Sequence, residues 1–259
     1  MPELPDLEAY SKNLEKAVAG KPVREVVVYR PEKLNVGKEQ INSALTASQI
    51  SAFRRDGKEM LILFDNGRNV GIHLMLEGKF HVVSDLKSVD FKMVAFDFGE
   101  HFLVVSDPTG WAKMVLAPER PATPDALSPD FSRAYFLEKL REKKSKNIKA
   151  FLIDQSIVRG IGNAYADEIL WEAKVSPESK AGRLPDDVAG VLFDAVGAVL
   201  RRSVREILQI NPDVLNGEIR DFMRVHRKGK VMCPNGFRIR SKKIASKMTY
   251  YTEEQVLFG

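Results

Sequence analysis

Residues 155–168 read QSIVRGIGNAYADE, and this stretch places two glycines, Gly160 and Gly162, between two apolar segments. Glycines at this spacing are typical of a tight turn that closes one helix and opens another, and Asn163 is a suitable N-cap for the second helix. The backbone N–H groups at such a helix start suit a phosphate. A plain helical hairpin without a ligand has the same Gly-x-Gly spacing, so the stretch predicts a helix pair and leaves phosphate binding open.

The residues on both sides of this turn extend the helical region. Apolar residues at helical spacing predict helices over residues 132–141, 148–154, 164–173 and 185–209. Upstream of them, residues 117–130 contain four prolines and no periodic apolar pattern, which is typical of a linker. The linker separates this helical half from an N-terminal half with a different pattern.

The N-terminal half begins with one predicted helix and continues as short strands. Leu7, Tyr10 and Leu14 lie at helical spacing, and Gly20 ends that pattern. Short apolar runs then alternate with turn residues, and Asp65-Asn66-Gly67 and Phe98-Gly99-Glu100 are expected hairpin turns. This pattern predicts a β-sandwich or a β-barrel. The runs cover residues 23–29, 60–64, 70–76, 80–83, 93–98 and 102–106.

The composition of the 259-residue chain excludes several classes of protein. With 44% hydrophobic and 29% charged residues it is neither a disordered chain nor a collagen. A single cysteine, Cys233, excludes an internal disulfide and a zinc site built from several thiolates. No stretch reaches the roughly 18 apolar residues of a membrane span, and the first residues do not resemble a signal peptide. We therefore expect a soluble, cytoplasmic protein that uses no metal.

The positive charge is concentrated near the C-terminus. Residues 220–247 carry ten Lys or Arg and one acidic residue, although the net charge of the whole chain is only +5. A second basic cluster occupies residues 139–149. Two separate basic patches favour a polyanionic partner such as nucleic acid, but a solvated helix face and a solvated tail have the same composition.

Two further features are candidates for chemistry. Removal of Met1 would make Pro2 a terminal secondary amine with a pKa of about 8, which can attack an aldehyde-like carbon while Glu3 moves protons. The same Pro-Glu pair is also common at the start of a helix. Lys58 follows a turn and precedes a strand. A lysine there can bind a phosphate or stabilise a developing negative charge, but lysines in exposed turns also commonly prevent pairing at a strand edge.

Taken together, these motifs resemble the formamidopyrimidine-DNA glycosylase and endonuclease VIII family over nearly the whole chain. The opening residues 1–8, MPELPDLE, resemble the family's start, with Asp6 where glutamate is usual. Residues 148–155 and 160–171, followed by Pro177, resemble its helix-two-turn-helix motif. The resemblance implies an α+β protein of two domains, with an N-terminal helix and β-sandwich followed by a helical domain that ends in a β-hairpin finger.

The expected boundaries follow from this architecture and from the proline-rich stretch. The N-terminal helix and β-sandwich should cover residues 1–116, and the linker residues 117–130. The helix-two-turn-helix domain should cover residues 131–222, and the finger residues 223–259.

The same resemblance implies a base-excision repair enzyme that is both a DNA glycosylase and an abasic-site lyase acting by β- and δ-elimination. In that role Pro2 attacks C1′ of a damaged nucleotide flipped out of the duplex, Glu3 supplies the proton chemistry and Lys58 assists the elimination. The implied partner is double-stranded DNA with a damaged base or an abasic site. We expect a monomer of bacterial type, associated with the nucleoid, that needs no cofactor and does not bind a membrane.

Four further side chains acquire DNA-binding roles from the resemblance. Lys149 and Asn163 match residues that bind backbone phosphates, and Lys247 stands where the family places a finger arginine. Leu76, or the neighbouring Met75, would be the apolar wedge that fills the space of the flipped base.

Departures from the family pattern change the expected lesion. The finger keeps Cys233 but has no thiol at residues 252–255, so we expect a zincless finger that folds by packing on the helical domain. Asn235-Gly236 marks a turn between residues 231–232 and 237–239. Thr109 and Trp111 stand where the family has an arginine for the opposite base and a phenylalanine wedge. Val225 follows residues 216–222 almost at once, so the flexible lid over 8-oxoguanine is missing. We therefore expect oxidised pyrimidines or formamidopyrimidines to be favoured over 8-oxoguanine.

A different class of function stays open at this point. The changes at Thr109 and Lys247 and the missing lid also fit a protein that binds damaged or abasic DNA without useful glycosylase chemistry, or one that keeps only the lyase step. The presence of all three candidate catalytic residues favours the enzyme.

Overall fold

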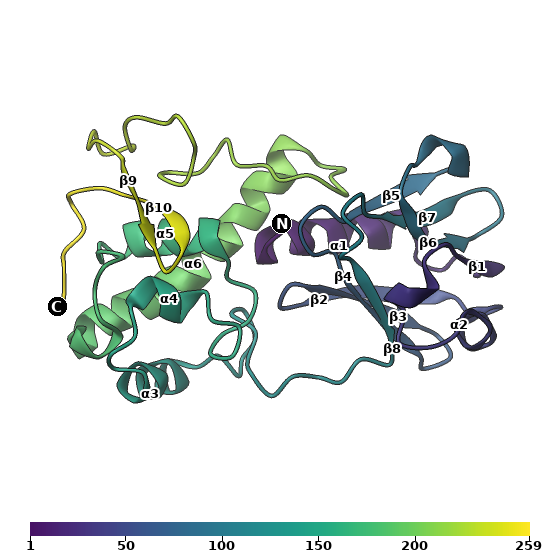
Figure 1. Cartoon of the computed structure of the whole chain (residues 1–259), viewed down its shortest axis with the longest axis horizontal. Helices are drawn as coiled ribbons and strands as arrows, with labels where there is room; N and C mark the ends of the chain where they lie inside the picture. Colours follow the sequence, from purple (N-terminus) through teal and green to yellow (C-terminus); the bar gives the residue numbers. More distant parts are fainter. The chain divides into compact units, whose positions relative to one another are not determined.

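The computed structural model describes all 259 residues and divides the chain into two compact units (Figure 1). The first unit contains Met1–Arg120 together with Ile207–Glu218, and the second contains Pro121–Glu206 together with Ile219–Gly259. Each unit buries its own apolar core. None of the helices is both long and apolar enough to cross a membrane.

The first unit begins with α1 (Leu4–Val18), the predicted N-terminal helix. Glu3 starts it with an extended backbone, and the Glu3 N–H donates to Asp6 Oδ2 at 2.9 Å. Pro5 lies in the first turn, where its missing N–H costs no helical hydrogen bond. The three residues that set the helical spacing are all buried, so the predicted face of the helix is the one that packs.

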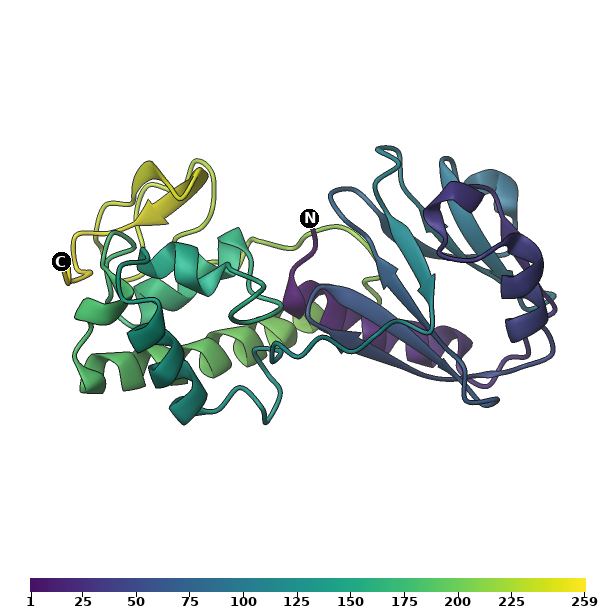
Figure 2. The same ribbon diagram turned by 60° about the horizontal axis from the view of Figure 1, so that its bottom comes forward.

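Two antiparallel four-stranded sheets follow, and they form a sandwich rather than a barrel because no strand pairs with the other sheet. One sheet has the order β1 (Glu25–Val28), β6 (Lys92–Asp97), β7 (Phe102–Ser106), β5 (Lys79–Val83). The other has the order β2 (Ile50–Asp56), β3 (Glu59–Phe64), β4 (Asn69–His73), β8 (Lys113–Leu116). The helix α1 packs beside β2, as Figure 2 shows, and α2 (Lys38–Leu45) contacts β1.

The predicted turns are present, and the missed elements have an explanation. Gly67 joins β3 to β4 with a φ of 77°, and Gly99 joins β6 to β7 with a φ of 95°, a backbone region that glycine enters without strain. β2, β8 and α2 lie outside the predicted runs. β2 includes the charged pair Arg54 and Arg55, and β8 has only four residues, so neither shows a continuous apolar pattern.

Residues 211–218 return to the first unit, although the sequence analysis placed them in the helical domain. The Tyr10 hydroxyl donates to the Gly217 carbonyl, and Asn13 Nδ2 donates to the Val214 carbonyl at 2.9 Å. Asn216 Nδ2 donates to the carbonyl of Phe80 in β5 at 3.0 Å. Single contacts between side chains and backbone carry no periodic sequence signal, so this attachment could not be predicted.

The second unit contains the four predicted helices, apart from the last turn of the fourth helix, which belongs to the first unit. They are α3 (Arg133–Glu142), α4 (Ile148–Leu152), α5 (Asn163–Glu172) and α6 (Asp186–Ile210). Ser132 caps α3 by accepting the Tyr135 N–H at 3.2 Å, and Asn147 caps α4 by accepting the Ala150 N–H at 3.1 Å. Side chains thus satisfy helix N–H groups at both starts.

The N-cap prediction for Asn163 is wrong by one residue. Gly162 is the N-cap of α5, with an extended backbone (φ −121°, ψ −163°), and Asn163 is the first helical residue. Because glycine takes the cap position, the Asn163 side chain is not used as a cap. It donates instead to the carbonyl of Met248 in the finger, at 3.0 Å.

The proline-rich stretch is packed against the turn that precedes α5. The Arg159 N–H donates to the Pro124 carbonyl at 2.9 Å, and the Ala126 N–H donates to the Arg159 carbonyl at 3.0 Å. Arg159 Nε also donates to the Thr123 carbonyl at 2.7 Å. The division between the two units falls within this stretch, at residues 120 and 121.

The finger contains two hairpins, of which one was predicted. The Asn235-Gly236 turn brings Met232 opposite Arg238, as expected. A second hairpin, β9 (Arg240–Ile244) and β10 (Lys247–Tyr251), closes through Ala245 and Ser246, with φ of 50° and 62°. These residues seldom adopt left-handed backbone, so the turn gave no sequence signal.

Candidate functional site

The N-terminus borders a cavity of about 290 Å³ in the first unit. Pro2, which is buried, lines it together with residues 217–218 and the loop between β4 and β5. The lining includes two carboxylate side chains, Glu77 and Glu218, and one ammonium side chain, Lys79. The α-ammonium group of Met1 forms an ion pair with Glu218, so a carboxylate holds the start of the chain at this cavity.

The chemistry of Pro2 depends on whether Met1 is present. With Met1 attached, the Pro2 nitrogen is an amide whose lone pair is delocalised, and it is not a nucleophile. Removal of Met1 turns the same atom into a secondary amine. Glu3 follows directly, is only 5% exposed and caps α1. The candidate nucleophile and the candidate proton carrier are therefore adjacent residues at the start of α1.

Lys58 lies in the tight turn between β2 and β3, after Gly57, and is half-buried. It is not among the residues that line the cavity at Pro2. Its charge acts on His73 at the end of β4: burial lowers the pKa of His73 below its ordinary value, and Lys58 and Lys113 lower it further. The neutral ring accepts the Met75 N–H at Nδ1 (3.0 Å), which leaves the Nε2 proton as a donor.

Sequence reasoning found Lys58 but missed His73 and Lys113, which lie directly opposite each other on β4 and β8. Two ammonium groups and a ring N–H at the ends of neighbouring strands are suitable ligands for a phosphate. The available signal was His73 itself, a histidine within the apolar run 70–76 and three residues before the wedge candidate Leu76.

One carboxylate organises the loop between β7 and β8. Asp107 is 1% exposed and accepts four hydrogen bonds of 2.6–2.9 Å, from the N–H and hydroxyl of Thr109 and from the N–H groups of Trp111 and Ala112. Burial raises the pKa of Asp107, but these hydrogen bonds outweigh it, so the pKa lies below its ordinary value. The Thr109 hydroxyl is thus engaged inside the loop, whereas Trp111 remains 59% exposed.

Leu76 is the second exposed apolar side chain near the candidate chemistry. It is 57% exposed in the loop after β4, and it also lines the cavity at Pro2. A lone exposed leucine is common on protein surfaces. Its place beside the candidate nucleophile distinguishes Leu76 and makes it the better wedge candidate than Met75, whose left-handed backbone (φ 56°) forms the turn.

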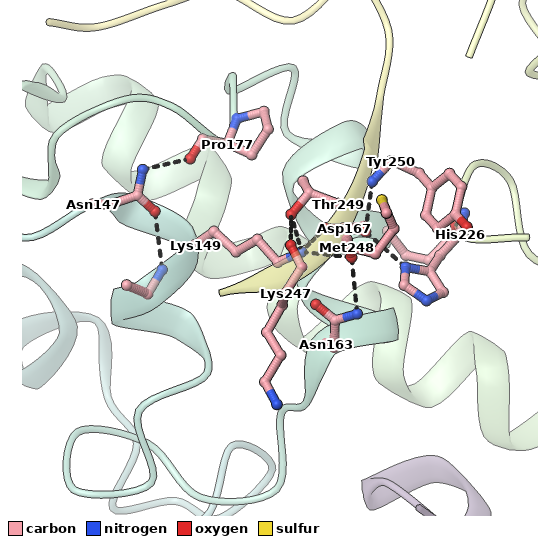
Figure 3. Close-up of polar contacts among 12 residues, drawn as sticks. Asn147, Lys149, Asn163, Asp167, Pro177, His226, Lys247, Met248, Thr249 and Tyr250 are labelled. Carbon is pink, nitrogen blue, oxygen red and sulfur yellow. Dashed lines mark hydrogen bonds and ion pairs between the residues drawn. The ribbon is translucent and has the colours of Figure 1, made fainter. Parts of the chain in front are cut away.

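Lys149, predicted to bind a phosphate, is not at the surface. Its side chain has no exposed area, and its ammonium group lies 2.7 Å from Asp167 Oδ1 and 2.5 Å from the Thr249 hydroxyl (Figure 3). A third, longer hydrogen bond of 3.4 Å reaches the Met248 carbonyl. The predicted phosphate contact is inconsistent with this burial, because the ammonium group already has protein partners.

Asn163 and Lys247 are better placed to bind a phosphate. Asn163 begins α5, and its buried Oδ1 atom has no hydrogen-bond partner. Lys247 begins β10 and is exposed, and in Figure 3 its side chain points away from the buried network around Lys149. Because Met248 accepts from Asn163, the two predicted phosphate ligands come from adjoining segments.

The finger residues do not fit the zinc site that the fold family implies. Cys233 is the single thiol, and Gly236, Thr252 and Gln255 stand at the other three ligand positions. Structural zinc is held by thiolate, imidazole or carboxylate groups, which glycine, threonine and glutamine lack. No group of three or more His, Cys, Asp or Glu residues in the chain is arranged to hold a metal ion.

Both units match known sequence families. The formamidopyrimidine-DNA glycosylase N-terminal domain matches residues 1–114, and the formamidopyrimidine-DNA glycosylase H2TH domain matches residues 122–211. The formamidopyrimidine-DNA glycosylase of Carboxydothermus hydrogenoformans is 32% identical, over 97% of this chain and 98% of that protein. That of Lactococcus lactis subsp. lactis is 28% identical, over 97% of each.

Solved structures agree with these matches. A complex between the Lactococcus lactis Fpg and DNA containing an abasic site has a TM-score of 0.86 and 26% identity, over 97% of this chain and 98% of that one. A complex of the Lactococcus lactis protein with DNA containing an oxidised pyrimidine gives 0.86 at 27% identity. Fold and sequence define a DNA-repair glycosylase of the type with an N-terminal β-sandwich and an H2TH domain. The chain belongs to the formamidopyrimidine-DNA glycosylase family.

Replacement Asp107→Asn tests the loop between β7 and β8. We expect it to lower the free energy of unfolding by about 1–3 kcal/mol at pH 7, because the amide loses one of the two acceptor oxygens. A carboxyl whose folded pKa is lowered stabilises the protein above its ordinary pKa of 3.8 and stops doing so as the pH falls through the folded value. The difference between wild type and variant in urea unfolding should therefore shrink below pH 3.8, and a difference independent of pH would contradict the role of this carboxylate.

Proposed function

We propose that the chain is a bifunctional enzyme of base-excision repair, which removes an oxidised base from double-stranded DNA and then cleaves the abasic site. The observation that carries this proposal is the cavity at the N-terminus. It lies beside Pro2, whose nitrogen becomes a secondary amine once Met1 is removed. The complexes of the Lactococcus lactis relative with abasic and oxidised-pyrimidine DNA support the substrate class.

The proposed reaction begins when the flipped nucleotide presents C1′ to the Pro2 nitrogen. The nitrogen bonds to C1′, the bond to the base breaks, and the base leaves with a proton. Loss of the nitrogen proton and opening of the sugar ring, whose O4′ takes a proton through Glu3, give an iminium. Removal of a C2′ proton expels the 3′-phosphate, a second elimination expels the 5′-phosphate, and water releases the amine. Lys58 assists these eliminations through its charge.

The phosphate contacts of the proposed complex come from both units. Asn163 and Lys247 supply an amide and an ammonium group beside the N–H groups at the start of α5. In the first unit, Lys58 and Lys113 supply two ammonium groups and the neutral His73 ring supplies an N–H donor. Such contacts position the duplex and carry no sequence information.

The proposed lesions are oxidised pyrimidines and formamidopyrimidines, ahead of 8-oxoguanine. Between the end of α6 at Ile210 and the finger the chain forms neither helix nor strand. The part of this stretch that belongs to the first unit ends at Glu218, so only residues 219–224 lie between it and Val225. Such a short segment leaves no room for a lid over a bulky purine. The Thr109 hydroxyl is bound to Asp107, so this position offers no donor to the opposite base.

A second candidate function is binding of abasic DNA without glycosylase chemistry, or with the lyase step alone. The changes at Thr109 and Lys247 and the missing lid favour it, because they remove contacts that a lesion-specific glycosylase would use. The two functions differ in one measurable respect, which is covalent trapping.

Borohydride trapping tests the amine. Protein verified by mass to begin at Pro2 should form a reduced covalent adduct with duplexes that contain an abasic site, dihydrothymine or formamidopyrimidine, because reduction fixes the iminium. A band should also form with 8-oxoguanine, but more slowly. The measurement is a denaturing gel of trapped protein against time.

The matched control carries one extra glycine before Pro2 and should give no adduct on any duplex. Binding of the abasic duplex without trapping by the Pro2 form would contradict the enzyme and support the binding protein. Trapping by the glycine-extended control would show that another amine reacts.

Replacement of Asn163 or Lys247 by alanine tests the phosphate contacts. Both variants should weaken binding to undamaged, abasic and lesion-containing duplexes by the same factor. Lys247→Ala should also reduce the slope of log affinity against log salt concentration by about 1. Fluorescence anisotropy at several salt concentrations measures both, with Lys38→Ala on α2 as an exposed control. A change in lesion preference would rule out a purely positioning role.

A further inference from the structure

A single carboxylate, Glu254, joins the finger to the end of α5. It accepts hydrogen bonds from Trp171 Nε1 at 2.7 Å and Asn235 Nδ2 at 3.0 Å, and it forms an ion pair with Lys174 at 2.6 Å. The Cys233 thiol also contacts it, at 3.6 Å. One side chain thus connects Trp171 of α5, Lys174 beyond the end of that helix and the Asn235-Gly236 hairpin.

Glu254 lies where the family's finger has its metal ligands, and the substituted residues bond to it and to each other. The Thr252 hydroxyl donates to Glu254 at 3.3 Å, and the Thr252 N–H donates to Gln255 Oε1 at 2.8 Å. Gln255 Nε2 donates to the Val175 carbonyl at 2.9 Å. Cys233, Thr252 and Gln255 are 4%, 1% and 8% exposed. Their polar groups are engaged with protein partners, so they are not arranged as ligands for a cation.

The surroundings keep Glu254 ionised. Burial raises its pKa, but the contacts with Lys174, Asn235 and Trp171 outweigh burial and lower the pKa to about 2. Lys174 also lies 4.4 Å from the centre of the Trp171 ring. Hydrogen bonds to an ionised acceptor are about twice as strong as those between neutral groups. The ionised carboxylate can therefore hold several segments together by accepting their hydrogen bonds, as a zinc ion does by coordinating thiolates.

A second carboxylate, Asp167, holds the other part of the finger (Figure 3). The Tyr250 N–H donates to it at 2.9 Å, and His226 Nδ1 lies 2.6 Å away. Lys149 pairs with it at 2.7 Å and also bonds Thr249, the neighbour of Tyr250 in β10. Asp167 and Lys149 therefore fix the position of β10 from inside the helical domain.

We propose that Glu254 replaces the metal in this finger, that Asp167 and Lys149 fix the position of β10, and that Lys149 is a positioning residue for Lys247 rather than a phosphate ligand. Lys247 immediately precedes Met248, whose carbonyl accepts from Asn163 and from Lys149. The buried lysine thereby sets where β10 begins relative to α5. The statement about Lys247 rests on the proposed DNA binding, whereas the metal-free finger does not.

Metal content and hydrogen exchange of the full-length protein without DNA test the carboxylate finger. The wild type should contain no stoichiometric zinc, and EDTA should leave amide protection of the finger unchanged. Glu254→Gln keeps the shape but removes the charge, so the N–H groups of Cys233 and Val256, bonded at 2.9 and 2.8 Å, should exchange roughly tenfold faster or more.

The neighbouring Glu253 provides a matched control. It pairs with Arg240 at the surface, where both side chains are 57% exposed, so Glu253→Gln should behave as the wild type. Stoichiometric zinc, loss of protection in EDTA, or equal exchange in the two variants would each overturn the carboxylate finger.

The role of Lys149 is tested by comparing Lys149→Met with Asn163→Ala. Lys149→Met should speed exchange across β9 and β10, including the Tyr250 N–H, and also weaken binding of an abasic duplex. Asn163→Ala should weaken binding while the Tyr250 N–H keeps its protection, because its acceptor Asp167 and the Lys149 pair are untouched. Weaker binding by Lys149→Met with normal protection would identify a phosphate contact and overturn the positioning role.

Thr249→Val is a milder variant that decides the question if Lys149→Met does not fold. It removes one of the partners of Lys149 and leaves the ion pair with Asp167 in place. Faster exchange in β10 is expected, and unchanged exchange would overturn the proposal. Because exchange is measured without DNA, failure of the glycosylase proposal would leave these outcomes intact.

Discussion

The ion pair between Lys149 and Asp167 is the contact on which the second unit depends, because both side chains are fully withdrawn from water. Removing one partner of such a pair typically costs about 3–5 kcal/mol, since the other charge stays buried. The pair joins α4 to α5 across the turn that contains Gly160 and Gly162. Its further hydrogen bonds go to Thr249 and Tyr250 of β10 and to His226. The packing of the helix pair and the position of the finger are therefore coupled through one buried charge.

Carboxylates play the same part elsewhere in the molecule. Glu168, beside Asp167, accepts the N–H groups of residues 224–226 at 2.7–2.8 Å, and its burial outweighs these bonds and raises its pKa. In the first unit Asp107 organises the loop of Trp111, and Asp6 accepts the Glu3 N–H at the start of α1. Asp6 stands where glutamate is usual in the family, and the shorter side chain still reaches its donor. Buried acids thus hold the loops, while every Lys and Arg other than Lys149 remains at least partly exposed to a polyanion.

The first residues of the chain serve both the fold and the proposed chemistry. Pro2 and Glu3 must start α1 and also line or adjoin the cavity where the proposed chemistry occurs. A helix start is suited to this, because its first residues are fixed by capping although they lie at the end of the chain. The attachment of residues 211–218 to α1 and β5 brings Glu218 to the same cavity. The position of the candidate amine is thereby set by contacts from distant parts of the sequence.

The sequence by itself determined the elements with a repeating signal. Apolar residues at helical spacing predicted α1 and α3 to α6. Short apolar runs, with turns at Gly67 and Gly99, predicted most strands of the sandwich. The family motifs pointed to Pro2, Glu3, Lys58 and Asn163. Only the tertiary structure decided what depends on single contacts between distant residues. It buried Lys149, engaged the Thr109 hydroxyl, returned residues 211–218 to the first unit and placed Glu254 at the centre of the finger. The physical reason is that periodicity reports which face of an element is buried, whereas a buried charge is recognised only when its partners are known.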